Sequence, residues 1–302
     1  MEMMRVNRIT VPAHLLLRPE GAIGRVHSVF GRGLNVVTQG RLIHIQWERE
    51  LKSPFSLALN KTFPTGLHES IKEGDEVVKK GERFRIGAGE WILYAPKEFY
   101  DPCIHPAGEI LESKLEQMST FLITEIRGFR ERLPSLNFLP ETEAIIENQT
   151  ESLLGGLRKR NLPFKLLREF TGKLIGLGPG LTPMGDDFII GIMGTFTLFR
   201  SHSKKVEDFF RNFREAIIAH LNATCAISRE FLLYATQTCF SEQIKNLLSS
   251  FSHKTLEEEK LKRTIQSVFD FGSTSGIGNL LGISCGLRVF SALRQNGEEA
   301  NG

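Results

Sequence analysis

The sequence is short of the features that mark several common classes of protein. Its 38 lysine and arginine residues are nearly balanced by 35 aspartate and glutamate residues, and a net charge of +3 is too small for a nucleic-acid-binding surface. The eight histidines never occur in the HxH or HxxxH spacing of a metal site. The longest apolar run, Phe188–Phe199, falls well short of the ~20 residues of a membrane span. We therefore expect neither a nucleic-acid nor a membrane partner, and a core helix at this run.

Cysteine is also scarce. The four cysteines, Cys103, Cys225, Cys239 and Cys285, are widely spaced and include no CxxC pair, so neither a zinc site nor a disulfide framework is indicated. The N-terminal segment lacks the continuous apolar region of a secretory signal. These absences predict reduced, mostly buried thiols in a soluble, cytoplasmic protein.

Two parts of the chain follow different hydrophobic periods. Residues 24–95 contain short β-type runs separated by turn residues such as EGDE and KKGE, whereas apolar positions after residue 108 recur at helical spacing. This change predicts an α+β protein. We expect a small N-terminal β-barrel or sandwich domain over residues 1–105, followed by a larger all-α domain over residues 106–302 that carries the glycine-rich loops.

The same periods give finer predictions. In the run LIHIQW, residues 42–47, approximate alternation predicts that His44 and Gln46 point outward. Helices are expected in the second part over residues 110–133, 141–158, 162–173, 183–200, 205–221, 224–239, 241–251, 255–270 and 279–294. A hydrophobic content of 41% is sufficient for a proper core.

One segment, GLGPGLTPMGDD at 176–187, concentrates glycine, proline and aspartate just before the apolar run. It is not a Walker loop, because Asp186 stands where that motif needs a lysine, and it is not a Rossmann fingerprint, because Leu181 replaces a required glycine. It does have the composition of a helix start. Thr182 is expected to be the N-cap, and Asp186 and Asp187 lie in or near the first turn, where their charges favour the positive end of the helix dipole.

The cap does not explain the three alternating glycines before it, Gly176, Gly178 and Gly180. Glycine loses more conformational freedom on folding than any other residue, and such a run is common where the backbone must approach another group closely. Two interpretations stay open: contact with a ligand, or a purely structural turn.

A second glycine-rich segment, at 270–279, contains Thr274, Ser275, Gly276 and Asn279 just before another apolar helix. Exposed backbone N–H groups at a helix start, with hydroxyls beside them, form an anion site. An ordinary serine cap on a glycine turn is the alternative for this segment.

Two further features lie between or beside these segments. Thr224 and Ser228 are four residues apart on one helix face, and their hydroxyls serve either a pocket or the carbonyls of their own helix. The adjacent carboxylates Asp186 and Asp187 are the ligand type that Mg²⁺ prefers, so Mg²⁺ is the one cofactor that the pattern admits. Helical neighbours point about 100° apart, so at most one of the two is expected to face a pocket.

Three of these segments together resemble the oxamate carbamoyltransferase subunit family (AllH-like), formerly a domain family of unknown function. They are GLGPGLTPMGDDF at 176–188, TCAIS at 224–228 and GSTSG at 272–276. In the N-terminal part, NVV, RLIHI and SPFSLAL occur in the expected order. The resemblance spans most of the chain, and its first motif is long enough to be specific.

The resemblance implies a subunit of a multisubunit enzyme of purine or allantoin breakdown, which converts oxalurate and phosphate into oxamate and carbamoyl phosphate. The expected ligand is therefore a small anion of this class. The resemblance also implies catalytic roles for Asp186 and Asp187. The residues expected to bind substrate are Gly178, Gly180, Thr182, Thr224, Ser228, Thr274, Ser275, Gly276 and Asn279.

The chain departs from the family pattern after its TSG sequence, where an acidic residue is expected and Gly278 and Asn279 stand instead. Two other functions therefore stay open. One is a Mg²⁺-dependent phosphotransferase or hydrolase that uses Asp186 and Asp187. The other is a non-catalytic assembly subunit, which would expose an apolar patch for another chain.

Overall fold

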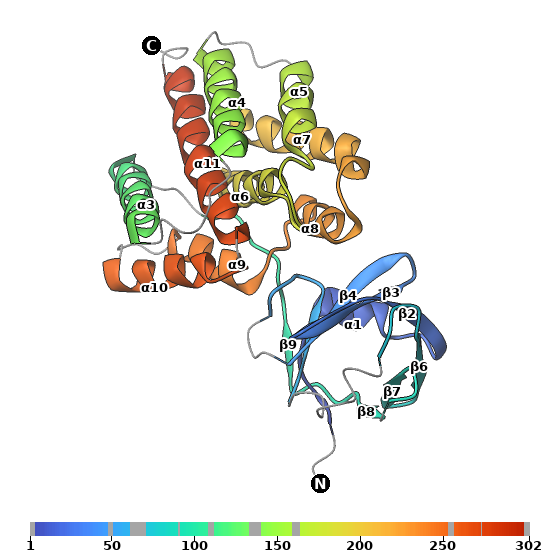
Figure 1. The fold of residues 1–302 in the computed structure, drawn as a ribbon. Helices are drawn as coiled ribbons and strands as arrows, with labels where there is room; N and C mark the ends of the chain where they lie inside the picture. The colour runs from blue at the N-terminus through green and yellow to red at the C-terminus, as the bar shows by residue number, and fades with distance from the viewer. Residues whose placement is uncertain are drawn as a thin grey trace. The chain divides into compact units, whose positions relative to one another are not determined.

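The computed structural model describes residues 4–47, 51–60, 71–89, 91–107, 112–132, 140–158, 164–252, 257–272 and 274–298. The chain divides into two compact units, Met1–Pro102 and Cys103–Gly302. The first is built on a β-sheet and the second is helical (Figure 1). This architecture confirms the predicted α+β class.

The first unit is a curled sheet of nine strands in the order β8-β7-β6-β2-β3-β4-β5-β1-β9. A bridge between Arg5 and Leu93 links the start of β1 to β8, so the sheet curls back on itself as a half-barrel (Figure 1). Apolar side chains such as Val6, Leu34 and Ile43 fill its core. The elements are β1 (Val6–Thr10), α1 (Val11–Leu16), β2 (Gly21–Phe30), β3 (Gly33–Thr38), β4 (Arg41–Gln46), β5 (Ser56–Leu59), β6 (Glu76–Lys80), β7 (Arg83–Ile86), β8 (Ile92–Leu93) and β9 (Glu98–Tyr100).

Strand β4 shows where simple alternation was misleading. His44 is half-buried, and its ring Nδ1 lies 2.8 Å from the Oδ1 atom of Asn35 on the neighbouring strand. Gln46 is buried, so the prediction that it points outward is wrong. Its side-chain oxygen accepts a hydrogen bond from the backbone N–H of Lys52, which satisfies a polar group that burial would otherwise leave unpaired.

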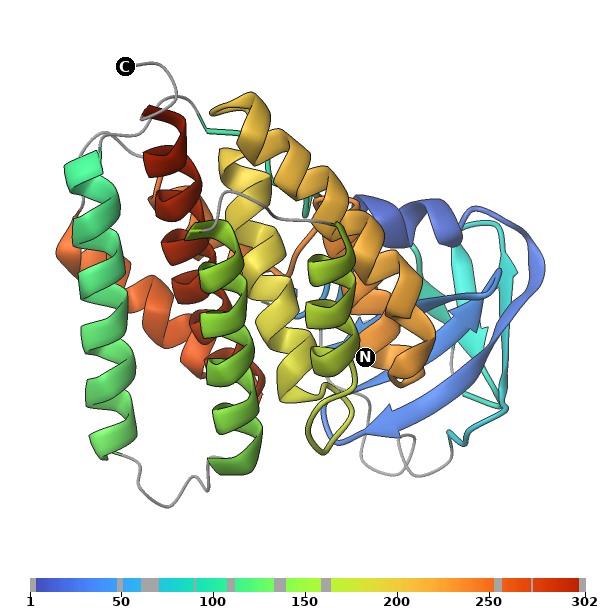
Figure 2. The same cartoon turned by 90° about the horizontal axis from the view of Figure 1, so that it is seen from above.

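The second unit packs its helices around a single apolar core. Helix α11 contacts α6 most extensively, and also α3, α4 and α10 (Figure 2, α3 in green and α11 in dark red). The elements are α3 (Glu112–Arg132), α4 (Pro140–Arg158), α5 (Phe164–Leu174), α6 (Met184–Phe199), α7 (Lys204–His220), η1 (Leu221–Ala223), α8 (Ala226–Thr236), α9 (Glu242–Ser250), α10 (Glu258–Phe269) and α11 (Ser275–Glu298).

Helices α6 and α11 pack closely because glycine lies at their contact. A Cβ atom built on Gly278 would lie 2.8 Å from the Cβ of Asp187, and one on Gly282 would lie 2.0 Å from the carbonyl oxygen of Phe188. The contacts advance in the same direction along both helices, from Asp187 beside Gly278 to Thr195 beside Gly286. The two helices are therefore parallel, and their N-termini lie at the same end.

One helix in the described part of the chain is long and apolar enough, by length and composition, to cross a membrane. It is the Ser275–Gln295 portion of α11, and 72% of its most apolar stretch is buried inside the protein. Burial of this extent is what a central core helix shows. The expected core helix at Phe188–Phe199 is α6, which is buried along its whole length.

The cysteines differ from expectation. Cys103 and Cys239 form a disulfide, so the prediction of reduced thiols is wrong for this pair. The backbone N–H of Ile104 donates to the carbonyl of Thr238 at 2.8 Å, which brings the two segments together. The cysteines are 136 residues apart in sequence, so no local spacing could have revealed them. Of the other two, Cys285 is buried and Cys225 is exposed.

Candidate functional site

The two glycine-rich segments meet in the folded chain. The hydroxyl oxygens of Thr182 and Ser275, which lie 93 residues apart in sequence, are 2.6 Å from each other. Because α6 begins at Met184 and α11 begins at Ser275, this contact joins the entrances of the two parallel helices.

The details of these entrances correct two predictions. The N-cap of α6 is Pro183, with no side-chain capping bond, and the hydroxyl of Thr182 faces Ser275 instead. Helix α11 starts four residues earlier than expected, so Ser275 and Gly276 are helical residues rather than loop residues. The placement of Asp186 in the first turn of α6, with its acidic neighbour, is confirmed.

Asp186 is fully buried and its carboxylate is surrounded by donors. Oδ1 accepts from the backbone N–H of Gly176 at 2.8 Å, and Oδ2 accepts from the hydroxyls of Thr224 at 2.5 Å and Ser228 at 2.6 Å. Burial raises the pKa of Asp186, and these three hydrogen bonds oppose that rise. The carboxylate thus ties the glycine-rich segment and the start of α8 to α6.

These bonds decide between the two interpretations of Thr224 and Ser228. Their hydroxyls do not bond to the carbonyls of their own helix, because both donate to the Asp186 carboxylate. Ser228 is fully buried, and Thr224 is half-buried before the first turn of α8. Their hydrogens are already committed, so a ligand would meet only lone pairs on these two oxygens.

Asp187 has very different surroundings. It is buried, with 3% of its surface exposed, and its Oδ1 accepts one long hydrogen bond of 3.4 Å from the amide Nδ2 of Asn279. Among the residues that the structure describes, its Oδ2 has no hydrogen-bond partner. Burial raises the pKa of Asp187 well above its ordinary value, the polar side chains of Ser275 and Asn279 oppose the rise, and the charge of Asp186 adds to it.

The three alternating glycines do not share one role. Gly176 and Gly178 have positive φ angles and lie against the protein itself: a Cβ on Gly176 would be 2.4 Å from the carbonyl oxygen of Ala223, and one on Gly178 would be 3.2 Å from the backbone nitrogen of Met184. Gly180 also has a positive φ, but a Cβ there would meet open space. The purely structural interpretation therefore explains the first two glycines, and the loop faces outward at Gly180.

The second segment contains glycines that helix packing requires. A Cβ on Gly276 would lie 2.0 Å from the carbonyl oxygen of Val268 in α10. Gly278 lies against Asp187 and the carbonyl of Met184, where a larger residue would separate α6 from α11. The missing acidic residue at this position thus has a structural reason. Thr274 lies half-buried just before α11, and its carbonyl accepts from the N–H of Gly278 at 3.1 Å.

Asp186 and Asp187 contact different groups, which does not favour a shared Mg²⁺ site. Among the residues that the structure describes, no group of three or more His, Cys, Asp or Glu side chains converges as metal ligands. Both oxygens of Asp186 already accept hydrogen bonds from protein groups, and Asp187 lies on a different side of the helix, beside α11. This geometry gives the phosphotransferase or hydrolase alternative no support.

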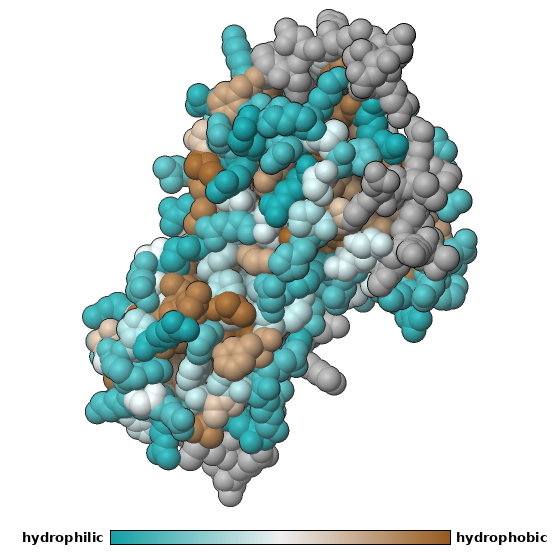
Figure 3. Space-filling view, turned by 180° about the vertical axis from the view of Figure 1, so that it is seen from behind, coloured by the Kyte–Doolittle hydropathy of each residue, from teal (hydrophilic) through white to brown (hydrophobic). Residues whose placement is uncertain are grey.

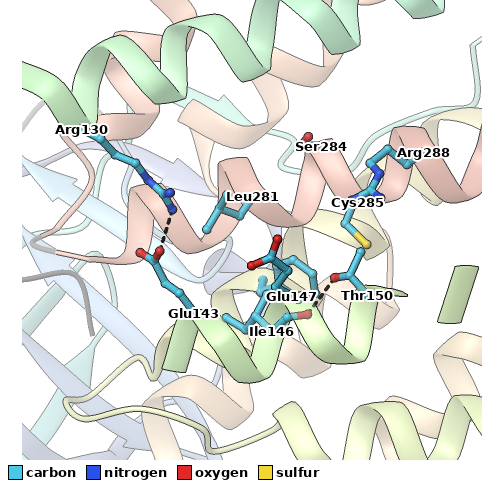
Figure 4. A pocket seen from close by; sticks show the side chains of 10 residues that line it. Arg130, Glu143, Ile146, Glu147, Thr150, Leu281, Ser284, Cys285 and Arg288 are labelled. Atoms are coloured by element: carbon cyan, nitrogen blue, oxygen red, sulfur yellow. Dashed lines mark hydrogen bonds and ion pairs between the residues drawn. The ribbon is translucent and has the colours of Figure 1, made fainter. Parts of the chain in front are cut away.

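A cavity that the sequence did not predict lies on another face of α11, between α3, α4 and α6 (Figure 4). It measures about 200 Å³, and Arg130, paired with Glu143 at 2.9 Å, lines one end. Arg288 and Cys285 line the other, where burial raises the pKa of the Cys285 thiol to about 12. These side chains come from three ordinary amphipathic helices, so no local motif marks them. None of the predicted site residues lines this cavity.

The comparisons with known proteins identify a family. A model described as oxamate carbamoyltransferase subunit AllH matches residues 174–287, and a model of the AllH family N-terminal domain matches residues 7–95. The first match contains both glycine-rich segments and the residues around Asp186. No curated protein and no solved structure matches the chain.

Proposed function

Because the chain belongs to the oxamate carbamoyltransferase subunit family, we propose that it binds the small anionic substrate of such an enzyme at the joined entrances of α6 and α11. The substrate class is carbamoyl phosphate, oxalurate or oxamate. The chain acts with other subunits of a multisubunit enzyme, in the cytoplasm, in the breakdown of purines or allantoin.

The observation that supports this proposal is the parallel arrangement of the two helices. Each helix N-terminus carries roughly half a positive charge, and the contact between Thr182 and Ser275 places two of them together. The positive charge of such an end, with hydroxyls beside it, favours an anion without any lysine or arginine. The outward-facing loop at Gly180 and the exposed Leu181 leave this entrance accessible.

Carbamoyl transfer is a reaction that such an entrance suits. A phosphate oxygen attacks the carbamoyl carbon, and negative charge grows on the carbamoyl oxygen as the new oxygen–carbon bond forms. That charge moves to the departing nitrogen when the carbon–nitrogen bond breaks. Fixed dipoles aimed at that charge stabilise the transition state. In this proposal Thr182 and Ser275 contact the anion directly, whereas Asp186 with Thr224 and Ser228 holds the loop in shape.

The test is a thermal-shift panel on the purified chain and a Thr182→Val variant. The ligands are phosphate, carbamoyl phosphate, oxamate, oxalurate and ATP, each with and without Mg²⁺. A ligand at a hundred times its dissociation constant adds about 2.7 kcal/mol of stability. We expect carbamoyl phosphate or oxalurate to stabilise the chain without Mg²⁺, and this stabilisation to disappear in Thr182→Val.

A matched control separates the site from a general effect of removing a hydroxyl. Thr124 is exposed on α3 and donates to the carbonyl of Thr120 in its own helix. Thr124→Val should keep the full ligand response. A metal-dependent effect of ATP, or a response to carbamoyl phosphate that survives Thr182→Val, would contradict the proposed site.

A specific observation also favours the assembly role as a second candidate. The β unit exposes large apolar side chains on α1 and β9, namely Val11, Leu15 and Phe99, and apolar residues gather on its surface in Figure 3. Exposed patches of this kind mark interaction sites. Leu15→Lys should then abolish co-purification with the other subunits of the enzyme while leaving the thermal stability of the isolated chain unchanged.

A further inference from the structure

Two buried oxygen atoms near the joined helix entrances have no hydrogen-bond partner in the described part of the chain. They are Oδ2 of Asp187 and Oδ1 of Asn279. Their side chains already share a hydrogen bond from Nδ2 of Asn279 to Oδ1 of Asp187, and both residues are at least 97% buried. Unpaired buried polar atoms are rare and costly in native proteins. Their occurrence on two bonded side chains needs an explanation.

Turning the Asn279 amide over does not solve the problem. In the observed orientation Nδ2 also donates to the carbonyl oxygen of Ser275 at 2.8 Å. The opposite orientation would set the amide oxygen against that carbonyl, and two acceptors would face each other. An ionised Asp187 offers only acceptors as well, so it cannot satisfy the amide oxygen of Asn279.

One added proton satisfies both atoms. A protonated Oδ2 becomes a donor, and the amide oxygen of Asn279 is the unpaired acceptor on the side chain to which Asp187 is already bonded. The two groups then form a cyclic pair of carboxylic acid and carboxamide, with one bond in each direction. We propose that Asp187 stores a proton in this pair at neutral pH and exchanges it with the entrance loop through the hydroxyls of Ser275 and Thr182.

Two hydroxyls lie between Asp187 and the entrance loop. The side chain of Ser275 is near enough to lower the pKa of Asp187. Its hydroxyl oxygen is 2.6 Å from that of Thr182, and either of the two can be the donor. Thr182 is half-buried and adjoins Leu181, which is 53% exposed. Reversing the two hydroxyl bonds would therefore move a proton between the buried acid and the loop.

The electrostatic surroundings agree with a neutral Asp187. Full burial and the nearby Asp186, on the same helix, both raise its pKa. The groups that face it from α11, Ser275 and Asn279, are uncharged. A neutral Asp187 also leaves the positive helix ends uncompensated on this side, which favours an anion there.

If the proposed function holds, this proton has a use. The oxygen–carbon bond to phosphate forms and the carbon–nitrogen bond of oxalurate breaks, so the departing oxamate nitrogen needs a proton. Asp187 would supply it through Ser275 and Thr182. The hydrogen phosphate that attacks loses its own proton and returns it along the same path. Protons balance without another reactant.

The test is infrared spectroscopy of the full chain alone at neutral pH, without ligand. We expect the carbonyl stretch of a protonated carboxyl, lost in Asp187→Asn and retained in Asp186→Asn. If Asp186→Asn does not fold, labelled aspartate in the native chain gives the same answer by carboxyl carbon NMR. A chain with no protonated carboxyl, or a band that survives Asp187→Asn, overturns the proposal.

The exchange path has its own readout. On transfer to D₂O the band shifts as the proton is replaced, and Thr182→Val should slow this shift at least about tenfold, which corresponds to 1.4 kcal/mol in the barrier. Thr182→Ser should restore the native rate. Equal rates in native chain and Thr182→Val overturn the path. No substrate is used, so a chain that keeps the band but binds no ligand would contradict the proposed function alone.

Discussion

Asp186 and Asp187 are neighbours in the first turn of one helix, and both are buried, yet their surroundings are opposites. Asp186 accepts three short hydrogen bonds from the glycine-rich loop, from Thr224 and from Ser228. Within the described ranges, Asp187 accepts one long bond from Asn279, and its other oxygen has no partner. Partner geometry, rather than burial, separates a structural carboxylate from a chemically available one.

The difference arises from what each side of α6 contacts. The Asp186 side contacts irregular backbone, whose N–H groups and capping hydroxyls need an acceptor. The Asp187 side contacts α11 at the closely packed Gly278. There the backbone N–H groups of Gly276 and Gly278 already donate to carbonyls, so side chains are the donors that remain for a carboxyl group. Asp186 therefore stabilises the fold through its hydrogen bonds, whereas Asp187 is buried by helix packing without being satisfied by it.

The largest effect is expected from Asp186→Ala. Removing the carboxylate leaves the N–H of Gly176 and the hydroxyls of Thr224 and Ser228 without an acceptor, at about 1–3 kcal/mol for each one that stays buried. We expect a loss of about 3–5 kcal/mol in the free energy of unfolding. Urea denaturation followed by circular dichroism measures it.

The control for that substitution is Asp208→Ala on the surface of α7. Asp208 forms exposed ion pairs with Lys204 and Arg211. Exposed pairs contribute little, so the loss should stay below about 1 kcal/mol. Equal losses at the two positions would mean that the buried hydrogen bonds of Asp186 do not stabilise the fold.

Asp187→Asn should instead raise the free energy of unfolding relative to the native chain at neutral pH. An asparagine amide can replace both bonds of a neutral carboxyl, because its NH₂ group donates where the acid proton did. The pKa of Asp187 is raised by folding, so the folded chain binds a proton that the unfolded chain releases above a pKa of about 4. Between the pKa of the unfolded chain and the higher pKa of the folded chain, the native protein then loses about 1.4 kcal/mol of stability for each pH unit.

The variant lacks this loss, so its stability relative to the native chain should rise from pH 5 to pH 7. The sign follows from linkage: a group with a raised folded-state pKa stabilises most below its unfolded pKa and loses that contribution as pH rises. Unfolding at several pH values, for both chains, tests it. Parallel curves would show that Asp187 is already ionised at pH 5.

The sequence predicted the elements better than their contacts. Hydrophobic periods located α3 to α10 to within a few residues, since helical spacing is a local property. They could not show that α11 begins at Ser275, because serine and glycine favour caps and turns in isolation and only packing against α6 makes them helical. Likewise Asp186 and Asp187 look alike in sequence, and their roles depend on residues 10 to 92 positions away.

A smaller effect is expected from Gly278→Ala. The new Cβ would lie 2.8 Å from the Cβ of Asp187 and 3.0 Å from the carbonyl oxygen of Met184. Overpacking of this kind costs about 1–3 kcal/mol, offset by the helix propensity of alanine, about 1 kcal/mol better than glycine. We expect a net loss of up to about 2 kcal/mol in the free energy of unfolding, measured by urea denaturation.

The matched control is Gly155→Ala on α4, where a Cβ would meet nothing within 4 Å. There the propensity gain stands alone, so stability should rise by up to about 1 kcal/mol. If both substitutions raise the free energy of unfolding, the contact between α6 and α11 can accommodate a methyl group without strain. The role assigned to Gly278, and with it the close approach of α11 to Asp187, would then be wrong.

The smallest effect is expected from Thr182→Val. This substitution removes the hydrogen bond between the two helix entrances, and Thr182 does not bond to Asp186 or to any of its three donors. Loss of one half-buried hydroxyl pair costs about 1 kcal/mol. Ser275 lowers the pKa of Asp187 and does not contribute to that of Asp186, so we expect the substitution to change the pKa of Asp187 alone. Carboxyl carbon NMR of both aspartates, titrated in native and variant chains, resolves the two. A shift confined to Asp187 supports two separate networks on one helical turn, and equal shifts would join them into one.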